Sequence, residues 1–177
     1  MKGVVFNVVE EVIVDMYDAD TWEDILDAVE LDGAYASLGS YPDEHLLAIV
    51  AEAARMLEVD VPTVLKTVGR AAFAGLADRH SQFERGDMTF AQFVQHVEAY
   101  IHPEVRKLYE DATVPNFDFE TLDDGNLRMT YSSPRNLPDL AEGLLMGAAD
   151  AFGERLKVLR PGIDVGANST VFDLVIG

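Results

Sequence analysis

The stretch FDFETLDDGNLRMTYSSPR (residues 117–135) decides the fold class of this chain of 177 residues. Apolar side chains alternate with polar ones on both sides of an Asp-Asp-Gly-Asn sequence, at Phe117 and Phe119 before it and at Leu127 and Met129 after it. Alternation around a glycine-containing turn is typical of two antiparallel strands. The stretch therefore predicts a β-hairpin.

Upstream of Pro115 the apolar spacing is helical instead. Apolar residues recur every three or four positions in five segments, which are residues 5–16, 25–29, 43–57, 61–76 and 89–109. The sequence Asp20-Thr21-Trp22-Glu23 predicts the cap of the second helix. Pro103 interrupts the last segment, because it cannot donate a helical hydrogen bond and its ring conflicts with the carbonyl of Ala99.

Downstream of the hairpin, helical spacing predicts one helix from Leu137 to Phe152, ended by Gly153. Two further strands are expected near residues 156–159 and 171–176. The expected fold is α+β, with a helical N-terminal part followed by a small antiparallel sheet with a packed helix. We expect a single domain over residues 1–177, divided into a helical subdomain at about 1–60 and an α+β subdomain at about 61–177.

The composition limits the chemistry of the chain. Cysteine is absent, which excludes disulfides and thiolate ligands for a metal. The net charge of −19 argues against binding to nucleic acid or to an anionic membrane surface. A solvated acidic surface and a docking face for a basic partner both stay open. No apolar run approaches the length of a membrane span, and Glu10, Glu11 and Asp15 interrupt any signal region, so a cytoplasmic location is expected.

The end of the hairpin carries a Tyr-x-Ser-x-Arg pattern at Tyr131, Ser133 and Arg135. In an extended segment residues two apart point to the same face, so the phenol, the hydroxyl and the guanidinium would form one row. Such a row fits a pair of carboxylates, because arginine can bind one of them through two hydrogen bonds. A strand end with ordinary surface polar residues is the alternative.

His102 is the second candidate for chemistry. The other histidines, His45, His80 and His96, lie among polar residues and are expected at the surface. Pro103 should kink the helix beside His102 and free a backbone carbonyl, which could orient the imidazole through one of its nitrogens. A structural role for a lone histidine at a helix boundary is the alternative.

His102, Pro115 and the Tyr-x-Ser-x-Arg row, together with the opening Met1-Lys2-Gly3, resemble the H-NOX family of haem nitric oxide/oxygen-binding sensors, over essentially the whole chain. The resemblance implies haem b held in the α+β subdomain. It further implies that His102 is the proximal iron ligand and that Pro115 presses on the macrocycle. The propionates would be held by Tyr131, Ser133 and Arg135.

The resemblance also places an apolar wall on the other side of the haem, formed by Val5, Val9, Phe73, Leu140 and Leu144. Oxygen-binding members of the family carry a tyrosine where Leu140 stands, supported by a tryptophan and an asparagine at the positions of Val9 and Ala72. Bound dioxygen needs such a hydrogen-bond donor and nitric oxide does not. We therefore expect binding of nitric oxide, with carbon monoxide as a probe ligand, and exclusion of dioxygen.

The leading hypothesis is a stand-alone, non-enzymatic gas sensor that regulates a separate partner, which in this family is often a histidine kinase or a cyclic-dinucleotide enzyme. A peroxidase-like haem enzyme is the second hypothesis, but the expected wall lacks the acid–base pair that peroxide cleavage needs. A haem-free interaction domain is the third. Gly143 and Gly147, four residues apart, predict close approach of either another helix or a flat ring.

Overall fold

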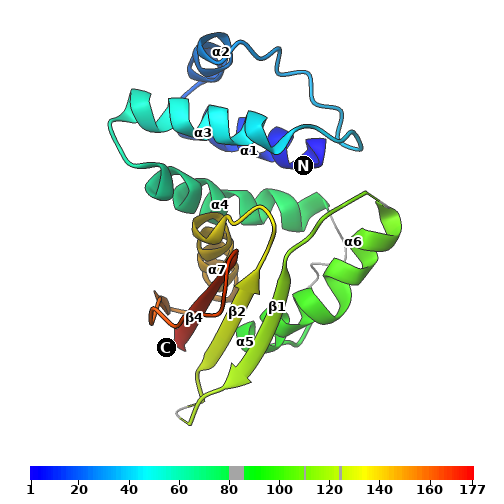
Figure 1. Cartoon of the computed structure of the whole chain (residues 1–177), viewed down its shortest axis with the longest axis vertical. Coiled ribbons are helices and arrows are strands. Elements are labelled where there is room, and N and C mark those ends of the chain that lie inside the picture. Colours follow the sequence, from blue (N-terminus) through cyan, green and yellow to red (C-terminus); the bar gives the residue numbers. More distant parts are fainter. Residues whose placement is uncertain (80–85, 110, 124) are drawn as a thin grey trace.

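The computed structural model describes residues 1–79, 86–109, 111–123 and 125–177. Helices come first along the chain, and the strands follow around one further helix (Figure 1). In chain order the elements are α1 (Gly3–Met16), α2 (Ala19–Ala28), α3 (Asp43–Leu57), α4 (Val61–Arg79), α5 (Phe90–His96), η2 (Val97–Ile101), α6 (His102–Leu108), β1 (Asn116–Thr121), β2 (Leu127–Ser132), α7 (Pro138–Phe152), β3 (Leu156–Leu159) and β4 (Ser169–Ile176). The expected α+β class is confirmed.

The four strands form one antiparallel sheet in the order β1-β2-β4-β3. The expected hairpin is β1 and β2, in which Phe117 pairs with Tyr131 and Phe119 pairs with Met129. Buried residues alternate with half-buried ones along β2, so one face of this strand packs on the core. Both later strands also lie where the sequence predicts them.

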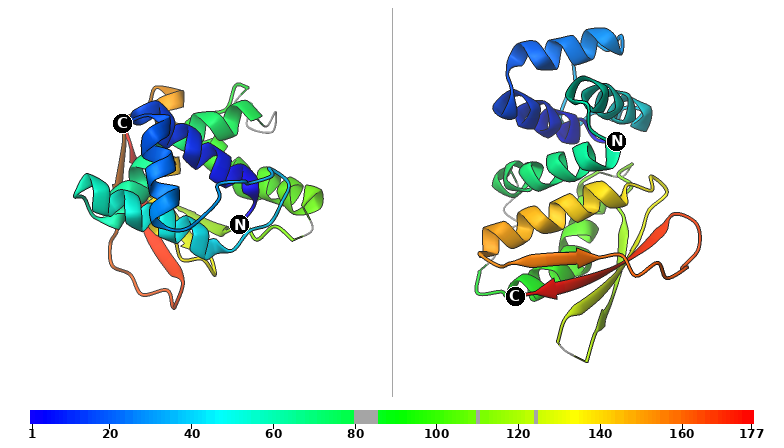
Figure 2. Two further views of the ribbon diagram at one scale, coloured as in Figure 1. Left: turned by 90° about the horizontal axis from the view of Figure 1, so that it is seen from above. Right: turned by 90° about the vertical axis from the view of Figure 1, so that its left-hand side faces the viewer.

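The helices stack in layers on this sheet. Figure 2 shows α2 above the pair α1 and α3, this pair above α4, and α4 packed on α7, which covers the sheet. The contact between α4 and α7 depends on glycine. A Cβ atom on Gly143 would lie 2.2 Å from the carbonyl oxygen of Lys66, and one on Gly147 would lie 2.3 Å from that of Arg70. The two glycines therefore allow close packing of another helix, which is the first of the two possibilities that the sequence predicted.

Two hydrophobic clusters fill the molecule. The first lies among the N-terminal helices and includes Phe6, Trp22 and Ile49. The second lies between α5, α7 and the sheet and includes Phe93 and Phe172. Helix α7 contributes to both clusters, so it joins the N-terminal layers to the sheet. No helix among the described residues is long and apolar enough to cross a membrane.

Some local expectations were wrong. Helix α2 begins earlier than the sequence suggests, because Asp18 caps it by accepting a hydrogen bond of 2.7 Å from the backbone N–H of Thr21. His45 is half-buried, with its Nδ1 atom 3.3 Å from the hydroxyl of Tyr35. His96 is also half-buried and stacks on Tyr100. His80 lies outside the described residues.

Candidate functional site

The segment that carries His102 is one helical run with a wide turn in its middle. Helix α5 passes into the π-helix η2, and α6 follows at once. The backbone N–H of His102 bonds to the carbonyl of Val97, five residues earlier. The irregularity caused by Pro103 is therefore a π-turn just before His102, and the helix continues past the proline. Turns of this kind are frequent at functional sites.

The imidazole of His102 is buried, with 9% of the residue exposed. Its Nδ1 atom lies 2.9 Å from Oε2 of Glu98, and the same oxygen accepts a hydrogen bond of 3.1 Å from the backbone N–H of Phe117. Glu98 thus connects the helix to the start of β1. Among the described residues no hydrogen bond to Nε2 of His102 is found.

This geometry sets the state of the imidazole. Burial lowers the pKa of His102 below its ordinary value, and the hydrogen bond that its imidazole donates to Glu98 opposes this shift without reversing it. A neutral imidazole with its proton on Nδ1 donates to Glu98 and presents the lone pair of Nε2, which is the form that binds a metal ion. The sequence predicted a freed backbone carbonyl in this orienting role, and the structure gives the carboxylate of Glu98 instead.

The three polar residues of the Tyr-x-Ser-x-Arg pattern do not share one strand. Strand β2 ends at Ser132, so only Tyr131 belongs to it, and Ser133 and Arg135 lie in the turn before α7. Tyr131 and Ser133 are buried. The hydroxyl of Tyr131 accepts a hydrogen bond of 3.1 Å from the backbone N–H of Leu137, and that of Ser133 accepts one of 3.2 Å from Arg135. Each hydroxyl keeps its own hydrogen for an acceptor.

The guanidinium of Arg135 joins three parts of the chain. Its Nη1 atom donates to the carbonyl of Thr113, two residues before Pro115. Its Nε atom lies 2.8 Å from Oδ2 of Asp43, in the first turn of α3, but this buried N–H has no aligned hydrogen-bond acceptor. Asp43 and Thr113 together occupy two of the five N–H donors of the guanidinium, so the others could bind a further anion.

Asp43 is itself an ionised group of this site. Burial alone would raise the pKa of Asp43, but the α-ammonium of Met1 and the guanidinium of Arg135 outweigh it and lower the pKa. Sequence reasoning missed Asp43 and Glu98. Asp43 looks like an ordinary acidic residue at a helix start. Glu98 and His102 are four residues apart, and this spacing on a helix was the one signal that could have paired them.

The apolar candidates divide between the two clusters. Val9, Ala72 and Leu140 belong to the N-terminal cluster, the first two buried and Leu140 half-buried. Phe73 and Leu144 pack in the second cluster, which also contains Tyr131. Val5 on α1 and Pro115 before β1 are half-buried and belong to neither cluster. Leu140 and Leu144 thus lie one turn apart on α7, at the border between the clusters.

Comparison with known proteins places this arrangement in a family. The profile described as Haem-NO-binding matches residues 2–160. An H-NOX protein from S. oneidensis in the Fe(II)NO ligation state superposes with a TM-score of 0.91 at 32% identity, covering 100% of this chain and 99% of that chain. The IWP-051-bound H-NOX from Shewanella woodyi, in the Fe(II)CO ligation state, gives a TM-score of 0.83 at 30% identity and covers 98% and 93%. No curated protein sequence matches the chain.

Proposed function

Because the chain belongs to the haem-NO-binding (H-NOX) family of haem-binding gas sensors, we propose that it senses nitric oxide at ferrous haem b, excludes dioxygen and regulates a separate signalling protein. The observation that carries the proposal is His102. This imidazole is buried, Glu98 fixes its Nδ1 atom at 2.9 Å, and Nε2 is left for a metal ion.

The polar and apolar residues fit the same cofactor. Ferrous haem, when bound, supplies an iron position at which a diatomic gas can coordinate. His102 would hold the iron, and the guanidinium of Arg135 would bind a carboxylate through the N–H donors that its contacts with Asp43 and Thr113 leave over. Tyr131 and Ser133 would donate their hydroxyl hydrogens to the propionates. Pro115 would contact the macrocycle, and the apolar wall would consist of Val5, Val9, Phe73, Leu140 and Leu144.

Selectivity for nitric oxide is proposed from the side chains of Val9, Ala72 and Leu140. All three are hydrocarbons, and none can donate a hydrogen bond to a bound gas. A missing hydrogen bond to a charge-bearing group costs about 1.5 to 3 kcal/mol, which is roughly ten- to a hundredfold in affinity. The same side chains offer no acid–base group, so no observation favours a peroxidase-like enzyme.

The relatives support the choice of ligands, since the proteins from the two Shewanella species bind nitric oxide or carbon monoxide at ferrous iron. For the partner we propose a histidine kinase or a cyclic-dinucleotide enzyme, through which the sensor would act.

Absorption spectra test the proposal. The purified ferrous protein should show haem bands that shift with nitric oxide and with carbon monoxide, and that do not shift to a stable new species in air. The variants Leu140→Tyr and Leu140→Phe form a matched pair, because they differ by one hydroxyl. Any gain of dioxygen affinity should be confined to Leu140→Tyr. A stable dioxygen-bound spectrum of the unmodified protein would contradict the selectivity, and absence of haem would contradict the whole proposal.

A further inference from the structure

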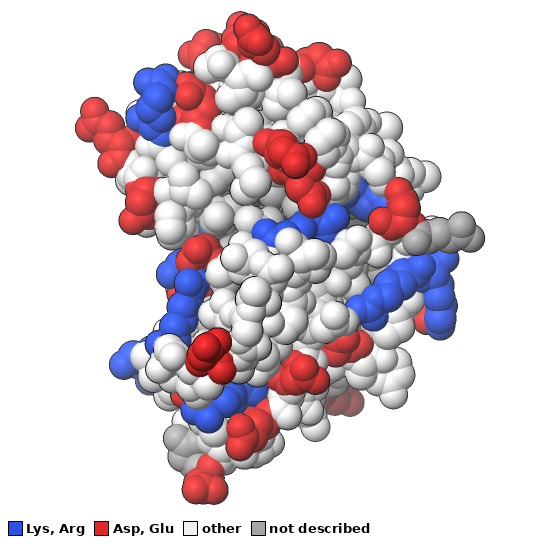
Figure 3. Space-filling model, viewed as in Figure 1, with Lys and Arg blue, Asp and Glu red and all other residues white. Residues whose placement is uncertain are grey.

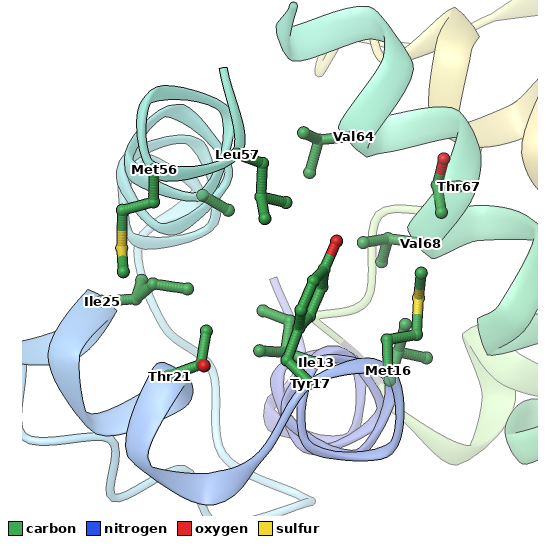
Figure 4. A pocket seen from close by; sticks show the side chains of 12 residues that line it. Ile13, Met16, Tyr17, Thr21, Ile25, Met56, Leu57, Val64, Thr67 and Val68 are labelled. Carbon is green, nitrogen blue, oxygen red and sulfur yellow. The ribbon is translucent and has the colours of Figure 1, made fainter. Parts of the chain in front are cut away.

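A cavity of about 180 Å³ opens between the ends of four N-terminal helices, and none of the residues assigned above to the haem lines it. None of the twelve described residues that line it is charged (Figure 4). Its rim includes Met16, Tyr17 and Met56, which are 47%, 47% and 37% exposed. In Figure 4 the ring of Tyr17 extends from the α1–α2 turn toward Leu57 and Val64. The cavity is thus an apolar depression with flexible methionines at its mouth.

Further apolar surface continues from this mouth. Val59, in the turn between α3 and α4, and Val61, the first residue of α4, are also exposed. Both residues follow Met56 closely in the chain, whereas Met16 and Tyr17 lie at the junction of α1 and α2. The exposed apolar side chains therefore come from the α1–α2 junction and from the α3–α4 junction. Exposed apolar side chains that are grouped mark an interaction site more often than single exposed residues do.

The rim around the cavity is acidic. Residues 3–54 contain 13 Asp and Glu and no Lys or Arg. Exposed carboxylates flank the mouth in the chain on both sides, from Asp15, Asp18, Asp20, Glu58 and Asp60. In Figure 3 the charged side chains of the upper, N-terminal layer are mainly acidic, with a basic group among them.

The basic residues nearest in sequence neutralise this rim only in part. After the side-chain and backbone hydrogen bonds that Asp60 accepts, Lys66 is a smaller cause of its lowered pKa, but Lys66 is bound elsewhere. Arg55 is bound by Glu52, with Nη2 2.6 Å from Oε1. Lys66 on α4 is bound by Glu142 on α7, with its Nζ atom 2.7 Å from Oε1. The carboxylates at the mouth therefore keep a negative field.

We propose that this cavity and its rim form a docking site for a basic amphipathic helix of a partner protein. The helix would insert one large apolar side chain between Met16 and Met56 and place lysines or arginines against the carboxylates. The cavity volume favours a single side chain over a drug-sized ligand, which takes about 300 to 1,000 Å³. A second copy of this chain and an anionic membrane are both disfavoured, because each would bring like charges together.

The cavity shares two helices with the proposed haem site. On α1, Val12 lines the cavity and Val9 lies one turn before it, and on α4, Val68 lines the cavity and Ala72 lies one turn after it. A partner seated here would contact the helices that carry the apolar wall. This link to sensing rests on the proposed function, but the docking site itself does not.

The docking test uses the full chain and a synthetic helical peptide of leucine and lysine, about 15 residues long so that its helix is stable. The methyl groups of the methionines, labelled with ¹³C, report binding by NMR. Met16 and Met56 line the cavity, whereas Met129 is fully buried in the other cluster and is the internal control. We expect saturable shifts at Met16 and Met56 alone, and no saturable shift with a peptide of equal charge in which serine replaces leucine.

Two sets of variants separate shape from charge. Thr67→Phe, at an exposed residue that lines the cavity, should fill it and weaken peptide binding about tenfold. Asp15→Asn with Asp20→Asn should weaken it several-fold more than the control Asp118→Asn with Asp123→Asn, which removes the same charge from the hairpin. Equal loss in the two double variants, or equal affinity for the serine peptide, would show attraction by net charge alone and overturn the proposal. If the protein binds the peptide but takes up no haem, the proposed function is refuted and the docking site is still supported.

Discussion

The N-terminal helices α1–α3 and the α+β part that follows them differ in how their charged side chains are paired. The N-terminal helices carry 13 acidic residues over positions 3–54 without a lysine or arginine. In the α+β part, acidic and basic side chains form pairs between elements. Arg128 on β2 binds Asp173 on β4 at 2.7 Å, and Arg70 on α4 binds Asp150 on α7 at 2.6 Å.

The difference shows what each part contributes to the candidate site. The residues that could bind a charged or polar group come mainly from the α+β part, namely Glu98, His102, Tyr131, Ser133 and Arg135. The N-terminal helices contribute the apolar Val5 and Val9, and one ion partner, Asp43. In the proposed function, anchoring would therefore depend on the second part, and the first part would provide the surface against which the bound molecule lies. The predictions that follow test this division.

The largest effect is expected at His102. The variant His102→Gly should lose haem, or retain it only when imidazole is supplied, because no other described residue of the site offers a neutral nitrogen ligand. The control is His96→Gly in the same helical run, since a glycine there has the same helix cost of about 1 kcal/mol. Haem content and the ferrous absorption spectrum are the measurements. An unchanged ferrous spectrum of His102→Gly without imidazole would remove His102 from the site.

Glu98 should have the next largest effect, as a residue that positions His102. Its carboxylate accepts from Nδ1 of His102 and from the backbone of Phe117. In Glu98→Gln we expect haem affinity to fall about 10- to 100-fold, the usual loss when the partner of a metal-binding histidine is changed. The iron–histidine stretching frequency should also fall, which a merely structural role would not cause. Glu104→Gln, a change of the same kind on α6, should leave both values unchanged.

Within the polar row, Arg135 should matter more than Ser133. A hydrogen bond to an ionised partner contributes about 1.5 to 3 kcal/mol, against about 1 kcal/mol for a neutral one. Haem dissociation should therefore be accelerated more in Arg135→Ala than in Ser133→Ala. The haem dissociation rate of Arg135→Lys should lie between those of wild type and Arg135→Ala, because lysine keeps the positive charge but lacks the paired N–H donors of a guanidinium. A larger effect of the serine variant would contradict the ordering.

The ion pairs of the α+β part should contribute measurably to the free energy of unfolding. Glu142 is buried and binds Lys66 and Arg160, each at 2.7 Å, so it ties α4 and α7 to the residue after β3. The two basic side chains are more than a third exposed, so solvent screens them. We expect Glu142→Gln to lower the free energy of unfolding by about 1 kcal/mol and Glu23→Gln, on the exposed face of α2, to leave it unchanged. If urea unfolding gave equal changes in the free energy of unfolding for Glu142→Gln and Glu23→Gln, ion pairing in the α+β part would not contribute more to stability than an exposed carboxylate of the N-terminal helices.

Much of this arrangement follows from the sequence, because local rules decide it. Alternation and a glycine turn identify the hairpin, and helical spacing ended by Gly153 identifies α7. Other features depend on contacts that local rules do not contain. The π-turn widens the helix just where Pro103 follows, and within it Glu98 contacts both His102 and Phe117, the second of which is distant in the chain.

Long-range ion pairs were equally hidden from sequence reasoning. Asp43 and Arg135 are far apart in the chain, and nothing in either local sequence pairs them. The expected single face of the Tyr-x-Ser-x-Arg row failed for a similar reason, since the strand ends at Ser132 and a turn places the last two residues. The start of α2 was misplaced because Asp18 and Asp20 are both plausible caps, and only the hydrogen bond to Thr21 decides between them.

The smallest effect is expected at Asp111, where the two parts of the molecule share a charge. Its carboxylate binds the ammonium of Lys2 at 2.5 Å and accepts from the hydroxyl of Ser40. The hydrogen bond from Lys2, then that from Ser40, lowers the pKa of Asp111 from 3.8 to about 2. A depressed pKa in the folded state means that the stabilisation is present above pH 3.8 and is lost as the pH falls toward 2.

Asp111→Asn should therefore be less stable than wild type near neutral pH, and the difference in the free energy of unfolding should shrink as the pH falls from 3.8 toward 2. Asp24→Asn, on the exposed face of α2, is the control. A stability difference for Asp111→Asn that stays constant down to the lowest pH would show that the side chain acts through packing, and that its charge does not help to join the two parts.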